Sequence, residues 1–321
     1  MMFRNLLPCL SAVIAALGLS HPSSAAEPVK VALVSRTLFN MPAWVAERKG
    51  FLREDGYEFT LNLTPSAEDL NTKLRSGFYQ FSISPPETII IDSGKPGNNV
   101  RVVGGNASKL PHFIIARPEI RTMAQLRGAH FGVYSDEEGT TYLLADIARA
   151  AGYPPGEYKV TAVGGAPTRW ELLKAGKIDV ALQPFPLSYQ AEAAGFTNLG
   201  PLLNIVPDWQ FTTINANEPW AKQNPKIVAS FLRALRKGQA YMEAHPDEAA
   251  KIAAEELRTD LPLAKRALGD SVKYGILNIE LSEPGLARMF QALKDARQIS
   301  TDRKFNLLDF ADTSYLEASK K

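Results

Sequence analysis

The sequence repeats one pattern of strands and helices at an offset of about 100 residues. A short β-like run ends at Ser35, and a similar run ends at Ser135. In both copies there follow a helical segment, a second apolar run and a helix that ends in glycine, at Gly77 and Gly176. A third apolar run then stops at a cluster of prolines. Strands that alternate with helices predict βαβ units with parallel sheets, so the repeat predicts two α/β lobes.

The rest of the chain, from about residue 212, has the periodicity of helices. A helical block without a sheet of its own must pack on another part of the fold, and we expect the first lobe to be its partner. We therefore predict a first lobe from residues 27–115 and 212–321, and a second lobe from residues 116–211. The chain would cross between them near residues 116–118 and return near residues 209–213, so that two crossings form a hinge.

The first 26 residues have the pattern of a secretory signal peptide. Arg4 supplies a positive charge, an apolar stretch covers residues 6–19, and residues 24–26 are small, as at a cleavage site. A membrane anchor is the alternative, but the stretch is shorter than the roughly 20 residues that span a bilayer. Cys9 lies within the apolar stretch, which argues against a lipoprotein. We expect an exported chain that retains no thiol after cleavage.

The composition and the missing motifs exclude several classes of function. The 36 Lys and Arg balance 34 Asp and Glu without a basic stripe, so we expect no nucleic-acid partner. His112, His130 and His245 are isolated in the sequence, so we expect no metal site. The chain has no G-x-S-x-G, Walker or G-x-G-x-x-G motif, and we expect no cofactor. The acidic cluster at 136–138 fits acid–base chemistry or a cationic ligand, but we favour the simpler interpretation of acidic residues at a helix N-terminus.

The loops that follow matching strands are the candidate binding site. Ligands of open α/β sheets bind beyond the carboxyl ends of the strands, and two facing lobes would line one cleft from both sides. The start of the helix at Gly139 offers backbone N–H groups to an acceptor, Arg36 offers a donor fork, and aromatic rings offer a flat surface. For single residues the alternatives are core packing or a surface ion pair. The predicted ligand-binding residues are Arg36, Thr37, Phe39, Asn40, Ser84, Glu87, Thr88, Asn106, Ser135, Glu138, Gly139, Thr140, Thr141, Gln183, Phe185 and Trp209.

Four segments of the chain also resemble a known family. Residues 41–56, 126–133, 176–185 and 224–249 are similar to motifs of periplasmic binding proteins of the nitrate, sulfonate, taurine and thiamine-pyrimidine-precursor type. The resemblance covers essentially the whole chain after the leader. It implies the type II periplasmic binding protein fold, with two α/β lobes joined by a two-crossing hinge. It also implies a periplasmic monomer that captures a small-molecule ligand and delivers it to an ABC transporter permease in the inner membrane.

The resemblance leaves the ligand open. Relatives that bind simple anions carry small residues where this chain has the acidic cluster 136–138, which disfavours a plain nitrate or sulfonate. Arg36, Thr140 and Thr141 favour an acid group, whereas Glu87 favours a cationic or donor-rich group such as an aminopyrimidine. We expect a receptor and not an enzyme. Relatives of this fold include a desulfinase that relies on a cysteine and a pyrimidine synthase that relies on a histidine, whereas this chain has no cysteine after the leader and, His112 aside, no histidine in the cleft loops. An enzyme or a sensor domain on the same scaffold is the alternative.

Overall fold

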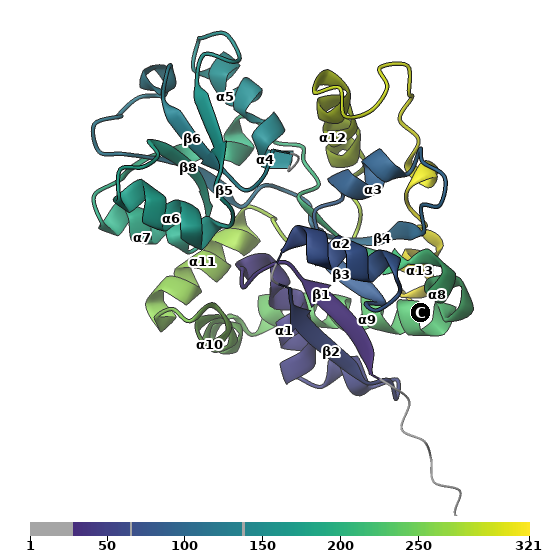
Figure 1. Cartoon of the computed structure of the whole chain (residues 1–321). Helices are drawn as coiled ribbons and strands as arrows, with labels where there is room; N and C mark the ends of the chain where they lie inside the picture. The colour runs from purple at the N-terminus through teal and green to yellow at the C-terminus, as the bar shows by residue number, and fades with distance from the viewer. Residues whose placement is uncertain (1–27, 65, 137–138) are drawn as a thin grey trace, which may run out of the picture.

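The fold consists of two five-stranded sheets with helices on their faces (Figure 1). The computed structural model describes residues 28–64, 66–136 and 139–321, so the expected signal peptide lies outside the described residues. The first sheet contains β1 (Val29–Leu33), β2 (Phe59–Leu63), β3 (Phe81–Ser84), β4 (Val100–Ala107) and β10 (Thr212–Asn217). The second sheet contains β5 (His112–Ala116), β6 (His130–Val133), β7 (Lys159–Ala162), β8 (Val180–Pro184) and β9 (Thr197–Pro201).

The two sheets have the same topology, which confirms the duplication. Their strand orders are β2-β1-β3-β10-β4 and β7-β6-β8-β5-β9. The strands of the repeat pair in parallel in both, with Val31 opposite Phe81 and Phe131 opposite Val180. The prediction of wholly parallel sheets is wrong, however, because β10 and β5 run antiparallel to their neighbours. Each of these strands follows a crossing between the sheets and therefore enters its sheet from the opposite end.

The chain crosses between the sheets twice. It leaves the first sheet after Ala107 and enters the second at His112, earlier than the 116–118 expected from the sequence. It returns through Trp209, Gln210 and Phe211 into β10, and the Phe211 N–H donates to the Ala107 carbonyl at 2.8 Å. The two crossings therefore lie side by side.

Short helices follow the strands, as the repeat predicts. In the first lobe these are α1 (Met41–Arg48), α2 (Ala67–Arg75) and α3 (Glu87–Asp92). In the second they are α4 (Gly139–Tyr142), α5 (Leu144–Ala150), α6 (Ala166–Lys174) and α7 (Leu187–Ala193). Their ends follow local rules: the Ser66 hydroxyl caps α2 by accepting from the Asp69 N–H at 3.1 Å, and Gly50 follows α1 at a φ of 78°.

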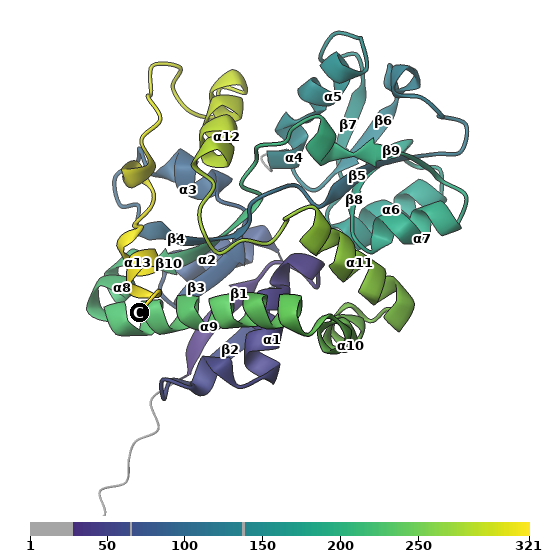
Figure 2. The ribbon, with the colours of Figure 1, turned by 180° about the vertical axis from the view of Figure 1, so that it is seen from behind.

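The C-terminal helices contact both lobes (Figures 1 and 2). They are α8 (Glu218–Gln223), α9 (Pro225–Ala244), α10 (Pro246–Leu257), α11 (Leu261–Lys273), α12 (Glu283–Asp295) and α13 (Ser314–Ala318). As predicted for the block, α9 packs on the first lobe, against α1. In contrast, α11 lies beneath the second lobe, where the Tyr189 hydroxyl donates to Asp270 and Phe185 stacks on Tyr274 at 6.4 Å between ring centroids. Within the described residues no helix is long and apolar enough to span a membrane.

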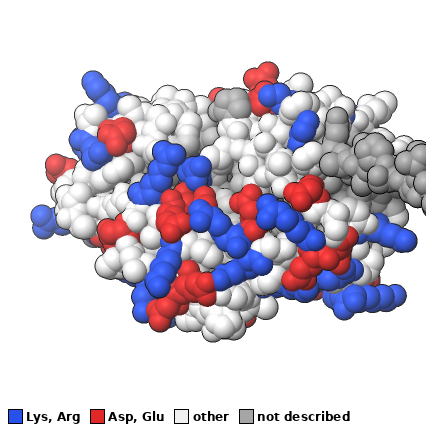
Figure 3. All heavy atoms as spheres, turned by 90° about the horizontal axis from the view of Figure 1, so that it is seen from below, with Lys and Arg blue, Asp and Glu red and all other residues white. Residues whose placement is uncertain are grey.

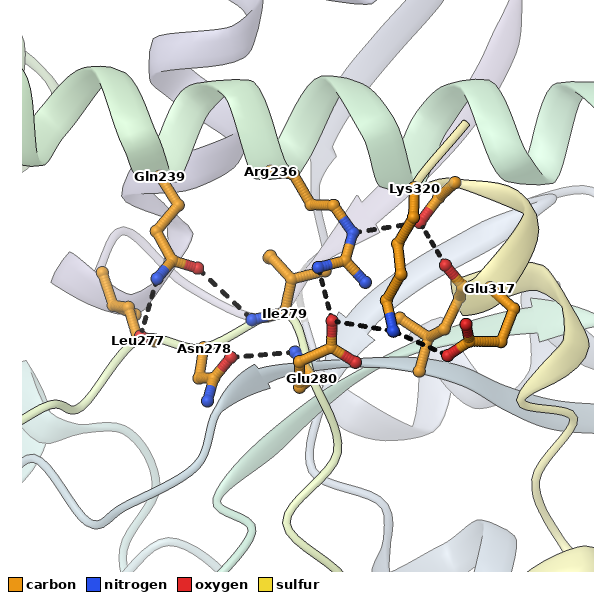
Figure 4. A network of polar contacts seen from close by, with 10 residues as sticks. Arg236, Gln239, Leu277, Asn278, Ile279, Glu280, Glu317 and Lys320 are labelled. Carbon is orange, nitrogen blue, oxygen red and sulfur yellow. Dashed lines mark hydrogen bonds and ion pairs between the residues drawn. The ribbon is translucent and has the colours of Figure 1, made fainter.

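The segment 276–280 covers the outer edge of β4 and is held there by α9 (Figure 4). Gly105 donates its N–H to the Ile279 carbonyl at 2.8 Å, and a Cβ on Gly105 would fall 2.1 Å from the Glu280 carbonyl oxygen. Gln239 donates to the Leu277 carbonyl at 3.2 Å, while Arg236 pairs with Glu280 at 2.6 Å. β4, which leads into the first crossing, is thus paired with β10 on one edge and with the segment 276–280 on the other.

Candidate functional site

A cavity of about 530 Å³ opens between the two lobes. From the first lobe it is lined by Ser84, Glu87 and Thr88, and from the second by Ser135, as predicted, and by Tyr134, which the sequence analysis did not single out. The prediction also missed a wall formed by α2, including Asn71 and Thr72, because it considered only the loops that directly follow strands. Cavities of about 300 to 1,000 Å³ suit small organic molecules.

Glu87 and Gly139 meet across the boundary between the lobes. Glu87 is the first residue of α3 and is only 3% exposed, although it carries a carboxyl group. A Cβ on Gly139 would fall 2.0 Å from the Glu87 Oε1 and 2.9 Å from Cζ2 of Trp209. Gly139 therefore lets the carboxyl group and the indole ring approach the backbone at the start of α4.

The loop after β1 buries polar groups beside the crossings. Asn40 donates to the Ser35 carbonyl at 2.5 Å, and Asn106 donates to the Phe39 carbonyl and to the Thr212 hydroxyl, both at 2.9 Å. The oxygens left over, Oγ1 of Thr37 and Oδ1 of both Asn40 and Asn106, are buried without a hydrogen-bond partner among the described residues. A buried polar group without a partner costs about 1 to 3 kcal/mol, so we expect a water molecule or a ligand to complete these groups.

The aromatic residues are more deeply buried than a stacking surface requires. Phe39 packs edge-on against Phe211 at 5.3 Å. Phe185 is 1% exposed and packs against Phe113 at 5.3 Å, so its position fits the alternative of core packing. Trp209 is fully buried, and its indole Nε1 has no hydrogen-bond partner among the described residues. Of the predicted aromatic set, Trp209 is therefore the one with a free polar group beside Gly139.

Arg36 does not point into the cavity. Its guanidinium donates to the Glu256 carboxylate of α10 at 2.9 Å and to the Glu256 carbonyl at 3.2 Å. Glu256 also pairs with Arg48 of α1 at 2.7 Å. On the lower face of the molecule, Lys and Arg alternate with Asp and Glu (Figure 3). The expected donor fork for a ligand acid group is thus engaged in a surface network.

The remaining predicted residues lie on the second lobe. Thr140 is 3% exposed at the start of α4, and the Thr141 hydroxyl donates to the Ser135 carbonyl at 2.7 Å, which ties α4 to the loop after β6. Gln183 is buried, donates to the Ala166 carbonyl at 3.3 Å and has no partner for its Oε1 within the described part of the chain. Glu138 lies outside the described residues.

A buried arginine and a buried histidine stand near this region of the second lobe. Arg169 of α6 is 5% exposed and donates to the Gly164 and Leu182 carbonyls, both at 3.0 Å. Complete burial, together with the charge of Arg169, lowers the pKa of His112 to about 3. His112 is therefore neutral at physiological pH, and its ring packs against Phe211 at 4.9 Å. Sequence reasoning missed Arg169 because α6 follows the second strand of the repeat, whose loop was not assigned to the cleft.

The buried His112 predicts acid sensitivity. Its pKa in the folded protein, about 3, lies below the ordinary value of 6.5, so only the unfolded chain takes up a proton between these values. Proton uptake then favours unfolding, and the free energy of unfolding falls by about 1.4 kcal/mol per pH unit below 6.5. We expect His112→Gln to reduce the loss of stability between pH 7 and pH 5 by about 2 kcal/mol, measured by urea unfolding. His245→Gln, at an exposed histidine, is the control, and equal pH dependence of both variants would contradict the assignment.

The described residues contain no group of three or more His, Cys, Asp or Glu side chains arranged to hold a metal ion. The polar groups that line the cavity are mainly amide, hydroxyl and carboxyl groups, together with the cationic Arg75 and Lys95, which both pair with Asp92. They suit recognition of an organic molecule by hydrogen bonds.

The amino-acid sequence is similar to a family model and to three proteins. A family model described as NMT1/THI5 like matches residues 40–249. The binding protein YtlA of Bacillus subtilis is 24% identical over 68% of this chain and 66% of its own length. A formylaminopyrimidine-binding protein of Halalkalibacterium halodurans is 23% identical over 65% of this chain and 64% of its own length. The matches therefore span slightly less than two thirds of these relatives. A 4-amino-5-hydroxymethyl-2-methylpyrimidine phosphate synthase of Legionella pneumophila is 25% identical over 70% of this chain and 72% of its own length.

Solved structures share the whole architecture. The ligand-binding component of an ABC-type import system from Staphylococcus aureus, solved with zinc bound, superimposes with a TM-score of 0.76 at 14% identity, covering 91% of this chain and 99% of that one. The aliphatic sulphonate binding protein SsuA of Escherichia coli gives 0.71 at 14% identity, covering 89% and 92%. The desulfurization enzyme DSZB gives 0.69 at 12% identity, covering 91% and 98%. These likenesses confirm the predicted fold class.

Proposed function

Because the chain belongs to the NMT1/THI5-like family, we propose that it is a solute-binding receptor that closes two lobes around a small polar organic molecule. The observation that carries the proposal is the cavity lined from both lobes, at which a buried carboxyl group, Glu87, meets the backbone of Gly139. A group buried at such a boundary is brought into position by the approach of the lobes. Closure and recognition would then be one event, with the side-by-side crossings acting as the hinge.

The ligand of this receptor presents hydrogen-bond donors. Among the described residues, the partnerless oxygens deeper in the protein, behind the lining of the cavity, include the amide oxygens of Asn40, Asn106 and Gln183, which can only accept, and the Thr37 hydroxyl. Glu87 adds a buried carboxyl group, while Arg36 is engaged by Glu256. An amino-bearing heterocycle of the aminopyrimidine class meets these demands better than a sulfonate or a carboxylate. The relative named as a formylaminopyrimidine-binding protein supports the same class.

The cellular setting follows from the same proposal. The expected signal peptide would bring the chain to the periplasm, where it would act as a monomer and deliver its ligand to an ABC transporter permease in the inner membrane. The structural neighbour named as the ligand-binding component of an ABC-type import system supports this partner.

A second candidate is an enzyme on the same scaffold. It is favoured by His112, a neutral imidazole whose Nδ1 has no partner among the described residues, and by the relative named as a pyrimidine phosphate synthase. An enzyme would change the bound molecule. Mass spectrometry of the small molecule that co-purifies with the protein, before and after incubation, separates the two: a receptor returns the molecule unaltered, whereas an enzyme converts it.

A thermal-shift panel tests the receptor. We expect 4-amino-5-hydroxymethyl-2-methylpyrimidine to raise the melting temperature, because a ligand at a hundred times its Kd adds about 2.7 kcal/mol, or about 5 °C for a chain of this size. Ethanesulfonate and benzoate should give no shift. Arg36→Ala should retain the aminopyrimidine shift, because Arg36 contacts Glu256 and not the cavity. A sulfonate shift that disappears in Arg36→Ala would overturn the assigned ligand class.

A further inference from the structure

An ion pair crosses the boundary between the lobes beside α12. The Arg288 guanidinium donates to the Oδ2 of Asp146 at 2.5 Å. Asp146 belongs to α5 of the second lobe, whereas α12 packs on α3 of the first and also contacts α4 of the second. Beyond the end of α12, Arg303 donates to the Ile90 carbonyl at 3.1 Å and to the Ser93 hydroxyl at 2.8 Å, which fastens this part of the chain to α3. The pair therefore joins one lobe to the other.

The same helix is anchored on the returning crossing. The Ser282 N–H donates to the Gln210 side chain at 2.7 Å, and a Cβ on Gly285 would fall 2.6 Å from the Gln210 backbone nitrogen. One turn further along α12, the Arg288 guanidinium lies 5.9 Å from the centre of the Trp209 ring. Trp209 in turn borders Gly139. Arg288 thus lies over Trp209, which belongs to the returning crossing and borders Gly139.

The contacts at the opposite end of the boundary combine an ion pair with aromatic contacts. Figures 1 and 2 place α12 beside α3 and α11 beneath the second lobe. Near α11 the Arg266 guanidinium lies 3.7 Å from the centre of the Tyr189 ring and pairs with Glu192 at 3.5 Å. Burial and the hydrogen bond to Asp270 raise the pKa of Tyr189, so its hydroxyl remains a donor. The pair of Arg288 and Asp146 is shorter, at 2.5 Å, and its side chains are 30% and 19% exposed. A partly exposed pair exchanges its partner for water at little cost, which suits a contact that opens and closes.

We propose that Arg288 is a positioning residue that latches the lobes in the closed arrangement by pairing with Asp146, and that it thereby holds Trp209 against Gly139. When the lobes separate, Asp146 keeps Arg149 of its own helix as a partner, at 3.0 Å. Opening therefore breaks the ion pair between Arg288 and Asp146 and leaves the pair between Arg149 and Asp146 intact. The inference goes beyond the proposed function, because it assigns a conformational role to a residue outside the cavity lining.

The test measures the separation of the lobes in the ligand-free protein. Nitroxide labels are attached to cysteines at Ala150 of α5 and Gln291 of α12, in a background in which Cys9 is replaced by serine, and their distances are measured by double electron–electron resonance. We expect Arg288→Ala to shift the ratio of short to long distances about fivefold toward the long ones. Arg149→Ala removes the other partner of the same carboxylate without crossing the boundary and should leave the ratio unchanged.

Asp146→Asn is the second variant, since it keeps the shape of the side chain. It should shift the ratio as Arg288→Ala does, and the double variant should add nothing further, because both changes remove one contact. Circular dichroism with equal melting temperatures checks that each variant is folded. Unchanged distances in Arg288→Ala and Asp146→Asn, or an equal shift in Arg149→Ala, would overturn the latch. The distance measurement needs no ligand, so its outcome does not depend on the outcome of the thermal-shift panel.

Discussion

Glu87→Gln is expected to weaken binding of 4-amino-5-hydroxymethyl-2-methylpyrimidine by about fiftyfold, because hydrogen bonds to a charged group contribute about 1.5 to 3 kcal/mol. Glutamine keeps the length of the side chain beside Gly139 but carries no negative charge. The effect should be large because the group is only 3% exposed, so that water does not compete for it. Isothermal titration calorimetry at pH 7 measures the change.

Glu68→Gln provides a matched control for Glu87. Glu68 lines the outer part of the same cavity but is exposed on α2. Its replacement should change the affinity less than twofold, since exposed charges interact weakly. If Glu87→Gln and Glu68→Gln changed the affinity for the pyrimidine equally little, the proposed recognition of a donor group by Glu87 would be refuted.

Gly238→Ala is expected to destabilise the protein by about 3 kcal/mol, the upper range for overpacking of a tight contact. A Cβ at this position of α9 would fall 2.2 Å from the Pro42 carbonyl oxygen and 3.3 Å from the Ala46 nitrogen, both in the backbone of α1. Backbone atoms cannot turn aside as the end of a side chain does, so the two helices must separate. The free energy of unfolding in urea measures the loss.

Gly269→Ala is the corresponding control within another C-terminal helix. Gly269 lies in α11 and is exposed, with no atom within 4 Å of a Cβ built on it. Alanine should stabilise the helix there by about 0.5 to 1 kcal/mol, because it loses less backbone entropy than glycine. A similar loss of stability in both variants would show that close packing of α9 on α1 is not the cause.

Most of the fold could be predicted from the sequence because the repeat has clear local signals. The pairs Gly77 and Gly176, and the proline clusters after β3 and β8, mark equivalent turns in two equivalent units. The direction of β5 and β10 could not be predicted in this way. Each of these strands lies outside the repeated unit. Its direction depends on the path of the chain between the lobes, and no local sequence pattern predicts that path.

Site residues could be predicted where their position at the end of a strand places them in the cleft. They could not be predicted where the contacts of a long side chain decide its position. Ser84, Glu87 and Ser135 line the cavity because they follow strand ends, and Gly139 meets Glu87 for the same reason. Arg36 also follows a strand, but its long side chain reaches Glu256, more than two hundred residues further along the chain. The wall formed by α2 depends on which helix faces the other lobe, and that arrangement exists only when both lobes are assembled.

The interleaved path of the chain has a consequence for biogenesis. In the first sheet β10 lies between β3 and β4, so the sheet remains interrupted until residues 212–217 have left the ribosome. By that time the strands of the second sheet have all been synthesised. The lobe that begins first is therefore completed last, and β4 lacks its partner β10 while residues 108–217, about a third of the chain, are synthesised. A nascent chain of this design stays incompletely folded until late, which would suit the export that we propose.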